Sequence, residues 1–335
     1  MKNNKTAIVT GITGCIGHNL AERLIEEGID VIGLIRSSSD LSKIKNIKEK
    51  ISLVDIDSHE IINLANREID YCFHCAGSTY QGDNADNLRL QYISNVSFTK
   101  KIVEFCEAFD VKKFVHMSTA AVYYLERKLS TQKNNSTINF NGSEDHYIKT
   151  KYLSESCVRD SNLNSWTIIR PAVIFGKYDY NNYSKIFKLI NTDTIKHSLP
   201  SGISVCSIEN VVSGVMACVE NDCTGKTYLF SDKYISFQDI FQEISNSLGK
   251  KTKFRPVSIL MLKIFVIYLR IKSYFTKEEP ILNKNIVNLL TLKRTDDIGV
   301  LLQQSKQDLG YPVSEFDLEK IISKKAEWLK NEKLI

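Results

Sequence analysis

A glycine-rich turn between the first apolar strand and the first amphipathic stretch constrains the fold of this sequence more than any other feature. The turn directly follows the strand-like residues 6–10 and reads Thr10-Gly11-Ile12-Thr13-Gly14-Cys15-Ile16-Gly17. In such a turn one glycine permits a tight bend, one lets the backbone approach a pyrophosphate, and one permits close packing of helix on strand. The N-terminus of the next helix then attracts phosphate. The sequence therefore predicts a dinucleotide site with contacts at Gly11, Thr13, Gly14, Cys15, Ile16 and Gly17.

Short apolar strands alternate with amphipathic helices through the first half of the chain. We expect strands at residues 7–10, 31–35, 52–55, 71–75, 113–117 and 166–169, and helices at residues 17–27 and 96–109. This rhythm predicts an α/β fold with a doubly wound parallel sheet. The alternation weakens after Arg170, which predicts a dinucleotide-binding Rossmann domain (1–170) and a smaller, partly discontinuous substrate lobe (171–335). Strands near 204–208 and 227–230 are expected to rejoin the main sheet.

The composition is that of an ordinary globular protein. The 335 residues are 43% hydrophobic and 25% charged, which excludes a mostly disordered chain. The net charge of +5 does not by itself demand nucleic acid or membrane as a partner and only weakly indicates an anionic ligand. We expect a small-molecule substrate and no nucleic acid. The eight cysteines are scattered through apolar stretches and no signal peptide precedes them, which is typical of reduced thiols in a cytoplasmic protein. Cys72 and Cys75 lack a second pair that would complete a metal site.

The end of the second predicted strand indicates which dinucleotide is bound. Sites selective for NAD commonly present a carboxylate there to the ribose 2′-hydroxyl. This sequence has Ile35 at that place and Arg36 next to it. An arginine binds a 2′-phosphate through its planar fork of donors, whereas a carboxylate repels it. The sequence therefore favours NADP(H) over NAD(H), although a solvent-facing arginine at a strand end is an alternative interpretation.

A tyrosine and a lysine stand four residues apart at the start of a predicted helix. Tyr147 and Lys151 therefore share one helix face and can point into one site. A free tyrosine, with a pKa of about 10, is a poor base at neutral pH, but a nearby ammonium group favours its phenolate form. Such a tyrosine can transfer a proton to or from a reacting oxygen. The same spacing also arises by chance on helix surfaces, so the pair alone is weak evidence for a catalytic site.

Taken in order, these features resemble the extended short-chain dehydrogenase/reductase family of the NAD-dependent epimerase/dehydratase superfamily, over nearly the whole chain. The glycine turn is similar to the family's cofactor fingerprint, and residues 117–123 are similar to its fifth-strand motif. Further matches are Asp55-Ile56, His74-Cys75-Ala76-Gly77, Asn95-Val96, Arg170-Pro171 and Phe175-Gly176. The resemblance implies cofactor contacts from Asp55, Ile56, Cys75, Ala76, Gly77, Asn95, Tyr147, Lys151 and Pro171.

The same resemblance implies a catalytic group. Tyr147 would be the general acid/base, and Lys151 would hold the nicotinamide ribose and bias the proton of the tyrosine. Thr119 would orient and polarise the substrate oxygen, with Ser118 as a neighbouring candidate whose hydroxyl could equally be satisfied by the backbone. The cofactor supplies the redox chemistry, so no metal is needed. A homodimer formed through a pair of helices is expected from the family only.

Departures from the family pattern bear on the substrate. Ile203 stands where members that act on nucleotide sugars often carry a phosphate-binding arginine, and residues 209–211 are closer to the dihydroflavonol reductase and 3β-hydroxysteroid dehydrogenase branch. We therefore favour an NAD(P)-dependent oxidoreductase that interconverts a ketone and a secondary alcohol. The alternatives are an NAD-dependent nucleotide-sugar epimerase/dehydratase, a nucleotide keto-sugar reductase and, less favoured, a non-catalytic dinucleotide sensor. The polar stretch 126–145 could shape the substrate entrance.

Residues 249–277 form the one compositional anomaly, with eight basic residues and no acidic one. Their apolar run is interrupted by Lys263 and is shorter than the about 20 residues that a membrane-spanning helix needs. Basic and apolar residues together are typical of a helix that lies on an anionic membrane, which would place a weak surface contact near 256–275. The alternative is a helix that packs its apolar side on the lobe and keeps its lysines and arginines at the rim.

Overall fold

The computed structural model describes most of the chain. The described residues are 5–58, 61, 64, 67–79, 85–123, 146–180, 183–262, 264, 267–268, 271 and 298–335. The polar stretch 126–145, predicted to shape the substrate entrance, lies outside them.

Seven parallel strands form the central sheet, in the order β3-β2-β1-β4-β5-β6-β9. Their bounds are β1 Thr6–Thr10, β2 Asp30–Ile35, β3 Ser52–Asp55, β4 Tyr71–His74, β5 Lys113–Met117, β6 Trp166–Pro171 and β9 Lys226–Phe230. The chain steps outward from β1 to β3 and then returns to the other side of β1 with β4. Ligands of such sheets bind outside the carboxyl ends of the strands, where the strand order reverses. The predicted doubly wound α/β fold is confirmed.

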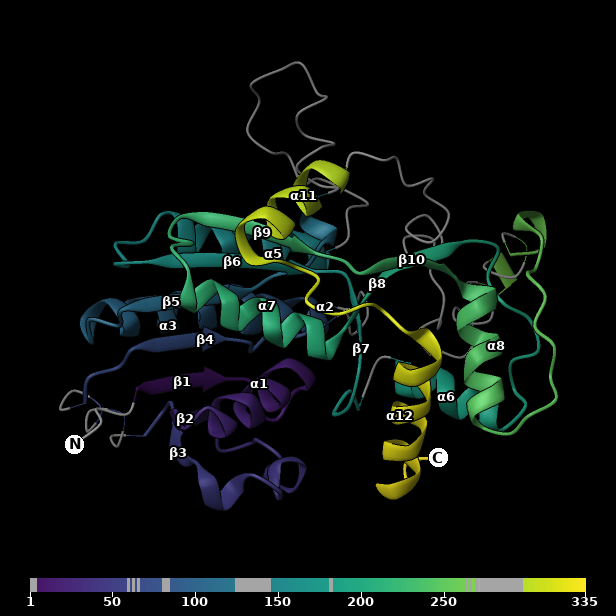
Figure 1. Cartoon of the computed structure of the whole chain (residues 1–335), viewed down its shortest axis with the longest axis horizontal. Helices are drawn as coiled ribbons and strands as arrows, with labels where there is room; N and C mark the ends of the chain where they lie inside the picture. Colours follow the sequence, from purple (N-terminus) through teal and green to yellow (C-terminus); the bar gives the residue numbers. More distant parts are fainter. Residues whose placement is uncertain are drawn as a thin grey trace.

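Helices cover both faces of the central sheet (Figure 1). Four of the helices that pack on it are α1 Cys15–Glu26, α3 Phe98–Ala108, α5 His146–Arg159 and α7 Ile208–Glu220. Val9 of β1 belongs to the buried cluster formed with α1 and α7. Its neighbour Ile8 belongs to a different cluster, formed with α3 and α5. Successive residues of β1 therefore face opposite helix layers, as in a strand buried on both sides.

Three shorter strands form a second sheet in the C-terminal lobe, in the order β10-β8-β7. This lobe contains β7 Val173–Phe175, β8 Gly202–Ser207, β10 Lys233–Ser236, α6 Tyr183–Asn191, α8 Phe237–Ser247 and α12 Leu318–Asn331. The prediction that residues 204–208 rejoin the central sheet is wrong. The outer edge of β6 is paired with β9, so β8 pairs instead with β7 on one side and with β10 on the other.

The remaining elements lie around the central sheet. They are α2 Ala85–Tyr92, the π-helical turn Ile93–Ser97, α11 Ile298–Leu309, and the 3₁₀ turns Leu41–Ile44 and Lys48–Lys50. The π-helical turn joins α2 to α3, where the sequence predicted a helix that starts at Val96. All eight cysteines are free thiols, and five of them are buried. In the described part of the chain, no helix is both long and apolar enough to cross a membrane.

Candidate active site

The glycine turn between β1 and α1 has a backbone that larger residues would disrupt. Gly11 has a φ of +65°, and a Cβ atom there would lie 2.7 Å from the backbone nitrogen of Ala76. A Cβ atom on Gly17 would lie 2.4 Å from the carbonyl oxygen of Gly11. Gly14, the N-cap residue of α1, supplies no side-chain cap to the first turn of the helix. The turn therefore brings α1 and the loop after β4 close to β1, with the first N–H groups of α1 suited to an anion.

The start of α1 also contacts the loop that follows β7. Cys15 Sγ and Asn19 Nδ2 both donate to the carbonyl oxygen of Lys177, each at 3.2 Å. Burial raises the pKa of the Cys15 thiol to about 12, so the thiol keeps the proton that it donates. Thr13 and Ile16, predicted like Cys15 to contact a cofactor, lie in the same turn and the first turn of α1.

A chain of buried hydrogen bonds connects the end of β1 to α3. Thr10 Oγ1 accepts from the N–H of Ala76 at 3.1 Å and lies 2.8 Å from His74 Nδ1, while His74 Nε2 lies 2.9 Å from Thr99 Oγ1. The Thr99 hydroxyl donates to the carbonyl oxygen of Asn95 at 2.6 Å. Burial, followed by the charge of Lys151, lowers the pKa of His74 to about 3, so the ring is neutral. One tautomer, with the proton on Nε2 and Nδ1 accepting from Thr10, satisfies every bond.

Asn95, in the π-helical turn, connects the loop after β4 to α5. Its Oδ1 accepts from the N–H of Ser78 at 2.7 Å, and its Nδ2 donates to Ser78 O at 3.0 Å and to Thr150 Oγ1 at 2.9 Å. The amide oxygen and nitrogen of Asn95 thus both have hydrogen-bond partners within the protein, and the residue is only 1% exposed. A Cβ atom on Gly77 would lie 3.1 Å from Asn95 Oδ1, which explains why glycine precedes Ser78. Asn95 therefore orients the loop and does not present its amide to a ligand.

Lys151 lies under the same loop, one helical turn after Tyr147. Its Nζ donates to the carbonyl oxygen of Met117 at 2.6 Å, and a Cβ atom on Gly77 would lie 3.7 Å from that Nζ. Burial lowers the pKa of the Lys151 ammonium group to about 8, against the opposite effect of the Glu155 carboxylate. Tyr147 is partly exposed, and its carbonyl oxygen accepts from Thr150 Oγ1 at 2.9 Å. The helix thus holds a buried cation and a more accessible phenol on one face.

The two hydroxyl residues after β5 have different partners. Ser118 Oγ donates to Glu155 Oε1, and the Ser118 residue is only 7% exposed. Thr119 is partly exposed, and its Oγ1 accepts from the N–H of Ala121 at 3.3 Å. An accepting hydroxyl still has its own proton to donate. Thr119 is therefore better suited than Ser118 to donate to a substrate oxygen.

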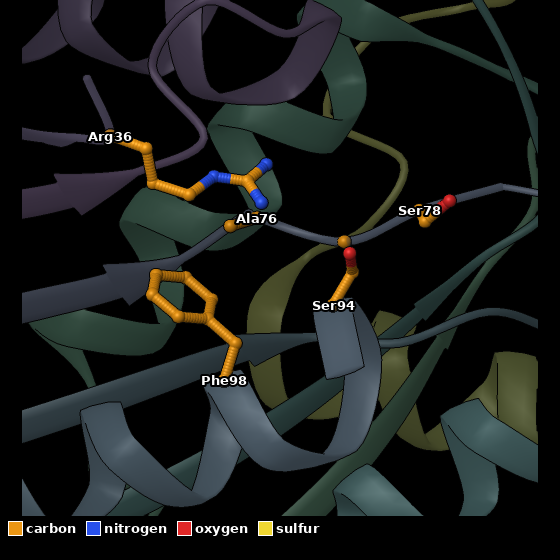
Figure 2. A pocket seen from close by; sticks show the side chains of 6 residues that line it. Arg36, Ala76, Ser78, Ser94 and Phe98 are labelled. Atoms are coloured by element: carbon orange, nitrogen blue, oxygen red, sulfur yellow. The ribbon is translucent and has the colours of Figure 1, made fainter. Parts of the chain in front are cut away.

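A pocket opens at the carboxyl ends of β2 and β4 (Figure 2). Its lining residues are Arg36, Ala76, Gly77, Ser78, Ser94 and Phe98. The Arg36 side chain extends from the end of β2 over Ala76, and Phe98 and Ser94 face it from the other side. The backbone N–H of Arg36 donates to Ser39 Oγ at 3.0 Å, while its side chain is exposed. An exposed guanidinium group thus borders a pocket beside the glycine turn.

The other predicted cofactor residues lie at the same edge of the sheet but do not line this pocket. Asp55 ends β3, and its Oδ1 accepts from the N–H of Asp57 at 3.0 Å. Ile56 is buried, and its N–H donates to the carbonyl oxygen of Ile35 at 2.9 Å. Pro171 ends β6, and its carbonyl oxygen accepts from Ala120 at 2.9 Å, next to Thr119. Cys75 is a partly buried thiol directly before Ala76.

Sequence reasoning missed several residues that build this site. Ser94 and Phe98 stand four apart, so a helix recognised one turn before Val96 would have placed both on one face. Thr10 and Thr99 carry no signal, because their role depends on His74 lying between them. In the described residues, no group of three or more His, Cys, Asp and Glu side chains is arranged to hold a metal ion.

The parallel sheet, the glycine turn and the lysine–tyrosine face define a nucleotide-dependent enzyme of the Rossmann class. The model of the NAD dependent epimerase/dehydratase family matches residues 7–203, and the chain belongs to that family. It is therefore an enzyme of a group that contains NAD-dependent epimerases, dehydratases and reductases.

Relatives of both chemical kinds are similar to this chain. The 4-hydroxy-2-methyl-3-oxo-4-farnesyl-3,4-dihydroquinoline-1-oxide ketoreductase of Stigmatella aurantiaca is 26% identical over 67% of both chains. The N-acetyl-alpha-D-glucosaminyl-diphospho-ditrans,octacis-undecaprenol 4-epimerase of Escherichia coli O157:H7 is 25% identical over 74% of both chains. A solved UDP-glucuronic acid 4-epimerase from Bacillus cereus, in complex with UDP-glucuronic acid and NAD, has the same fold. Its TM-score is 0.69 at 17% identity, over 98% of this chain and 99% of that one.

Proposed function

We propose that this protein is an NADP(H)-dependent oxidoreductase that interconverts a ketone and a secondary alcohol, with Tyr147 as the general acid/base. The position of Lys151 carries the proposal: its ammonium group is buried, donates to Met117 and lies one helical turn from Tyr147. A cation held in this way favours the phenolate form of a neighbouring tyrosine. A protein that only binds a dinucleotide has no need of such a pair, which argues against a non-catalytic sensor.

The residues at the carboxyl ends of β1, β2 and β4 fit a dinucleotide. The small clearance between Gly11 and Ala76 and the uncapped start of α1 suit a pyrophosphate, and the pocket beside Arg36 suits the adenosine half. When bound, the cofactor supplies or accepts the hydride. The residues that would hold it are Gly11, Thr13, Gly14, Cys15, Ile16, Gly17, Arg36, Asp55, Ile56, Cys75, Ala76, Gly77, Tyr147, Lys151 and Pro171, whereas the predicted contact Asn95 would act only by positioning the loop after β4.

Each residue near Tyr147 has a distinct part in moving one proton. In the reductive direction Tyr147 Oη donates its proton to the substrate's carbonyl oxygen, and in the oxidative direction it removes one from the alcohol. Thr119 Oγ1 donates a hydrogen bond to the same oxygen, because its other contact uses it as an acceptor. Lys151 stabilises the phenolate that remains. Asn95 acts through Ser78 and Thr150 as a positioning residue, which keeps the loop after β4 fixed against α5.

The alkaline limit of activity should report the ionisation of Lys151. Burial lowers its pKa from the ordinary value of 10.5 to about 8, so the group is charged below that pH and neutral above it. We therefore expect kcat/KM for ketone reduction to fall as the pH rises through about 8. A pH profile at constant ionic strength measures this. In Lys151→Arg the remaining activity should lose this alkaline decline, because a guanidinium group stays charged. A wild-type profile that is flat up to about pH 10 would contradict the assignment.

Arg36 should decide between the two cofactors. In Arg36→Ala the Kd for NADPH should rise about ten- to hundredfold, because a charge-assisted contact to the 2′-phosphate is lost, while the Kd for NADH should hardly change. Fluorescence titration with both nucleotides measures the two constants. Arg23→Ala, which removes an exposed arginine paired with Glu27 in the last turn of α1, is the matched control. If Arg36→Ala weakened the binding of NADPH and NADH equally, the 2′-phosphate would not be bound by Arg36.

A nucleotide-sugar epimerase/dehydratase or a nucleotide keto-sugar reductase is the second candidate. The Escherichia coli epimerase and the NAD-bound structure from Bacillus cereus favour it. Against it, Ile203 lies in β8 at the place of the expected arginine and packs against the apolar core of the C-terminal lobe. No cation is therefore provided at that position for a diphosphate.

Turnover separates the two candidates. We expect the purified protein to oxidise one NADPH for each ketone reduced and to release the oxidised cofactor. An epimerase would instead interconvert UDP-sugars with no net change in cofactor absorbance. The measurement is the absorbance of NADPH with a panel of ketones and, separately, product analysis with UDP-sugars. Mass spectrometry of the denatured protein identifies any nucleotide carried through purification. Sugar epimerisation without ketone reduction would replace the first candidate with the second.

A further inference from the structure

Large apolar side chains gather on one exposed surface of the C-terminal lobe. Thirteen such side chains are exposed in the described part of the chain, and seven of them fall between positions 259 and 271. The apolar surface consists of Ile259, Leu260, Met261, Ile264, Ile267, Tyr268 and Ile271, each between 51% and 68% exposed. Scattered exposed apolar residues are normal, but a contiguous group marks an interaction site.

The spacing of these residues is that of a helix, and their side chains are exposed to solvent. Residues 259–262, 264, 267, 268 and 271 are helical, and the last four follow Leu260 at intervals of 4, 7, 8 and 11, which is the spacing of one helix face. Leu262, on another face, is 3% exposed and packs inward. Among the described apolar residues of 259–271, Leu262 alone packs inward, as the alternative prediction of a helix packed on the lobe expects. The apolar side chains described at this spacing are therefore exposed and not packed on the lobe.

The segment before this surface is fixed to the lobe. Ser198 pairs with Pro256, the N–H of Ser198 donates to the carbonyl oxygen of Arg255, and the N–H of Val257 donates to that of Ser198. Phe254 is buried against Phe241 of α8. Figure 1 shows the following residues, 259–262, at the outer edge of the C-terminal lobe, away from β1 to β3. The exposed face is therefore presented by an anchored segment.

Positive charge borders the apolar surface. Lys251, Lys253 and Arg255 are exposed directly before it, and the sequence from 249 to 277 contains no acidic residue. A second copy of this chain would bring the same basic residues against each other, which is unfavourable. Anionic lipid headgroups would neutralise them while the acyl region receives the apolar side chains. Among the described residues no helix is long and apolar enough to cross a membrane.

We propose that the apolar surface docks this protein on the face of a bilayer that contains anionic phospholipid. Leu260, Ile264 and Tyr268 insert at the boundary between headgroups and acyl chains, and Lys251, Lys253 and Arg255 contact the phosphates. The docking needs neither cofactor nor catalysis, so the test of docking is independent of the proposed reaction.

Co-sedimentation of the full-length protein with vesicles tests the docking. We expect binding to vesicles of phosphatidylcholine with phosphatidylglycerol and much weaker binding to phosphatidylcholine alone. Binding should decrease when salt rises from about 0.1 M to about 1 M, because the Debye length falls from about 10 Å to about 3 Å. The double variant Leu260→Asp/Ile264→Asp should lower the partition constant about tenfold or more, since two apolar side chains no longer insert. Lys251→Glu/Lys253→Glu should remove the preference for phosphatidylglycerol.

Val313→Asp is the matched control, because Val313 is 58% exposed and lies outside the apolar surface. It should bind vesicles like the wild type, and thermal unfolding of every variant checks that the fold is kept. The proposal is overturned if the wild type fails to bind anionic vesicles, or if Leu260→Asp/Ile264→Asp binds them unchanged. It is also overturned if the wild type is a dimer in solution that this variant separates, because the surface would then join two copies of the chain.

Discussion

Replacing Tyr147 with phenylalanine should lower kcat for ketone reduction by about 10²- to 10⁴-fold, the usual contribution of a general acid/base. Phenylalanine keeps the ring and removes only the hydroxyl that donates the proton. The contact given by Thr150 should be kept, because the Thr150 hydroxyl donates to the carbonyl oxygen of Tyr147. Single-turnover measurements with saturating NADPH separate this chemical step from binding. The Kd for NADPH should change little.

Tyr152→Phe is the matched control for this experiment. Tyr152 is partly buried on the same helix, but its position five residues after Tyr147 places it on another helix face. Loss of the Tyr152 hydroxyl should leave kcat within a few-fold of the wild-type value. Full turnover by Tyr147→Phe would discard the proposed mechanism, and a loss of NADPH binding that accounted for the whole effect would make Tyr147 a binding residue only.

Features encoded over a few neighbouring residues could be predicted from the sequence. The glycine turn is one, because the close contact of Gly17 with the backbone of Gly11 is a property of a strand, a turn and a helix that follow each other directly. The pairing of β1 with β2 and β4 is another, because alternating strands and helices leave few topologies. The common face of Tyr147 and Lys151 also follows from helical spacing alone.

Features that depend on distant partners could not be predicted in this way. Residues 204–208 have the pattern of a buried strand, but that pattern does not say which strand edge is free, and β9 pairs with the edge of β6. The neutral ring of His74 connects Thr10 to Thr99, and these two residues come from different elements. Ser118 and Thr119 are adjacent in sequence, and the bond from Ser118 to the distant Glu155 shows that the Ser118 hydroxyl has a partner within the protein.

Glu155 has a role that sequence patterns do not reveal, and its removal should cause a large loss of stability. Its fully buried carboxylate accepts from Arg170 Nε at 2.9 Å and Nη2 at 2.6 Å, from Arg159 Nη2 at 2.7 Å, and from Ser118 Oγ. Burial raises the pKa of this carboxyl. The hydrogen bond and charge of Arg170, the hydrogen bond from Ser118 and the charge of Arg159 lower it by more, so the pKa lies below its ordinary value. These contacts connect α5, which carries Tyr147 and Lys151, to β6 and to the end of β5.

Glu155→Ala should lower the free energy of unfolding by about 3 to 5 kcal/mol, because the buried Arg170 loses its partner. Chemical denaturation at neutral pH measures this difference. Since the folded pKa of Glu155 lies below its unfolded value, its stabilising contribution is present above the unfolded pKa and is lost as the pH falls through the folded one. The difference between wild type and variant should therefore shrink in acid.

The exposed pair of Lys100 and Glu104 on α3 provides the control for Glu155. Removal of that exposed carboxylate in Glu104→Ala should change the free energy of unfolding by about 1 kcal/mol or less, because solvent screens the pair. If Glu155→Ala were no more destabilising than Glu104→Ala, Arg170 would have to be solvated once its partner is gone. The position of α5 would then depend on the apolar contacts of Val158 and on the bond from Asn95 to Thr150, and not on the buried ion pair.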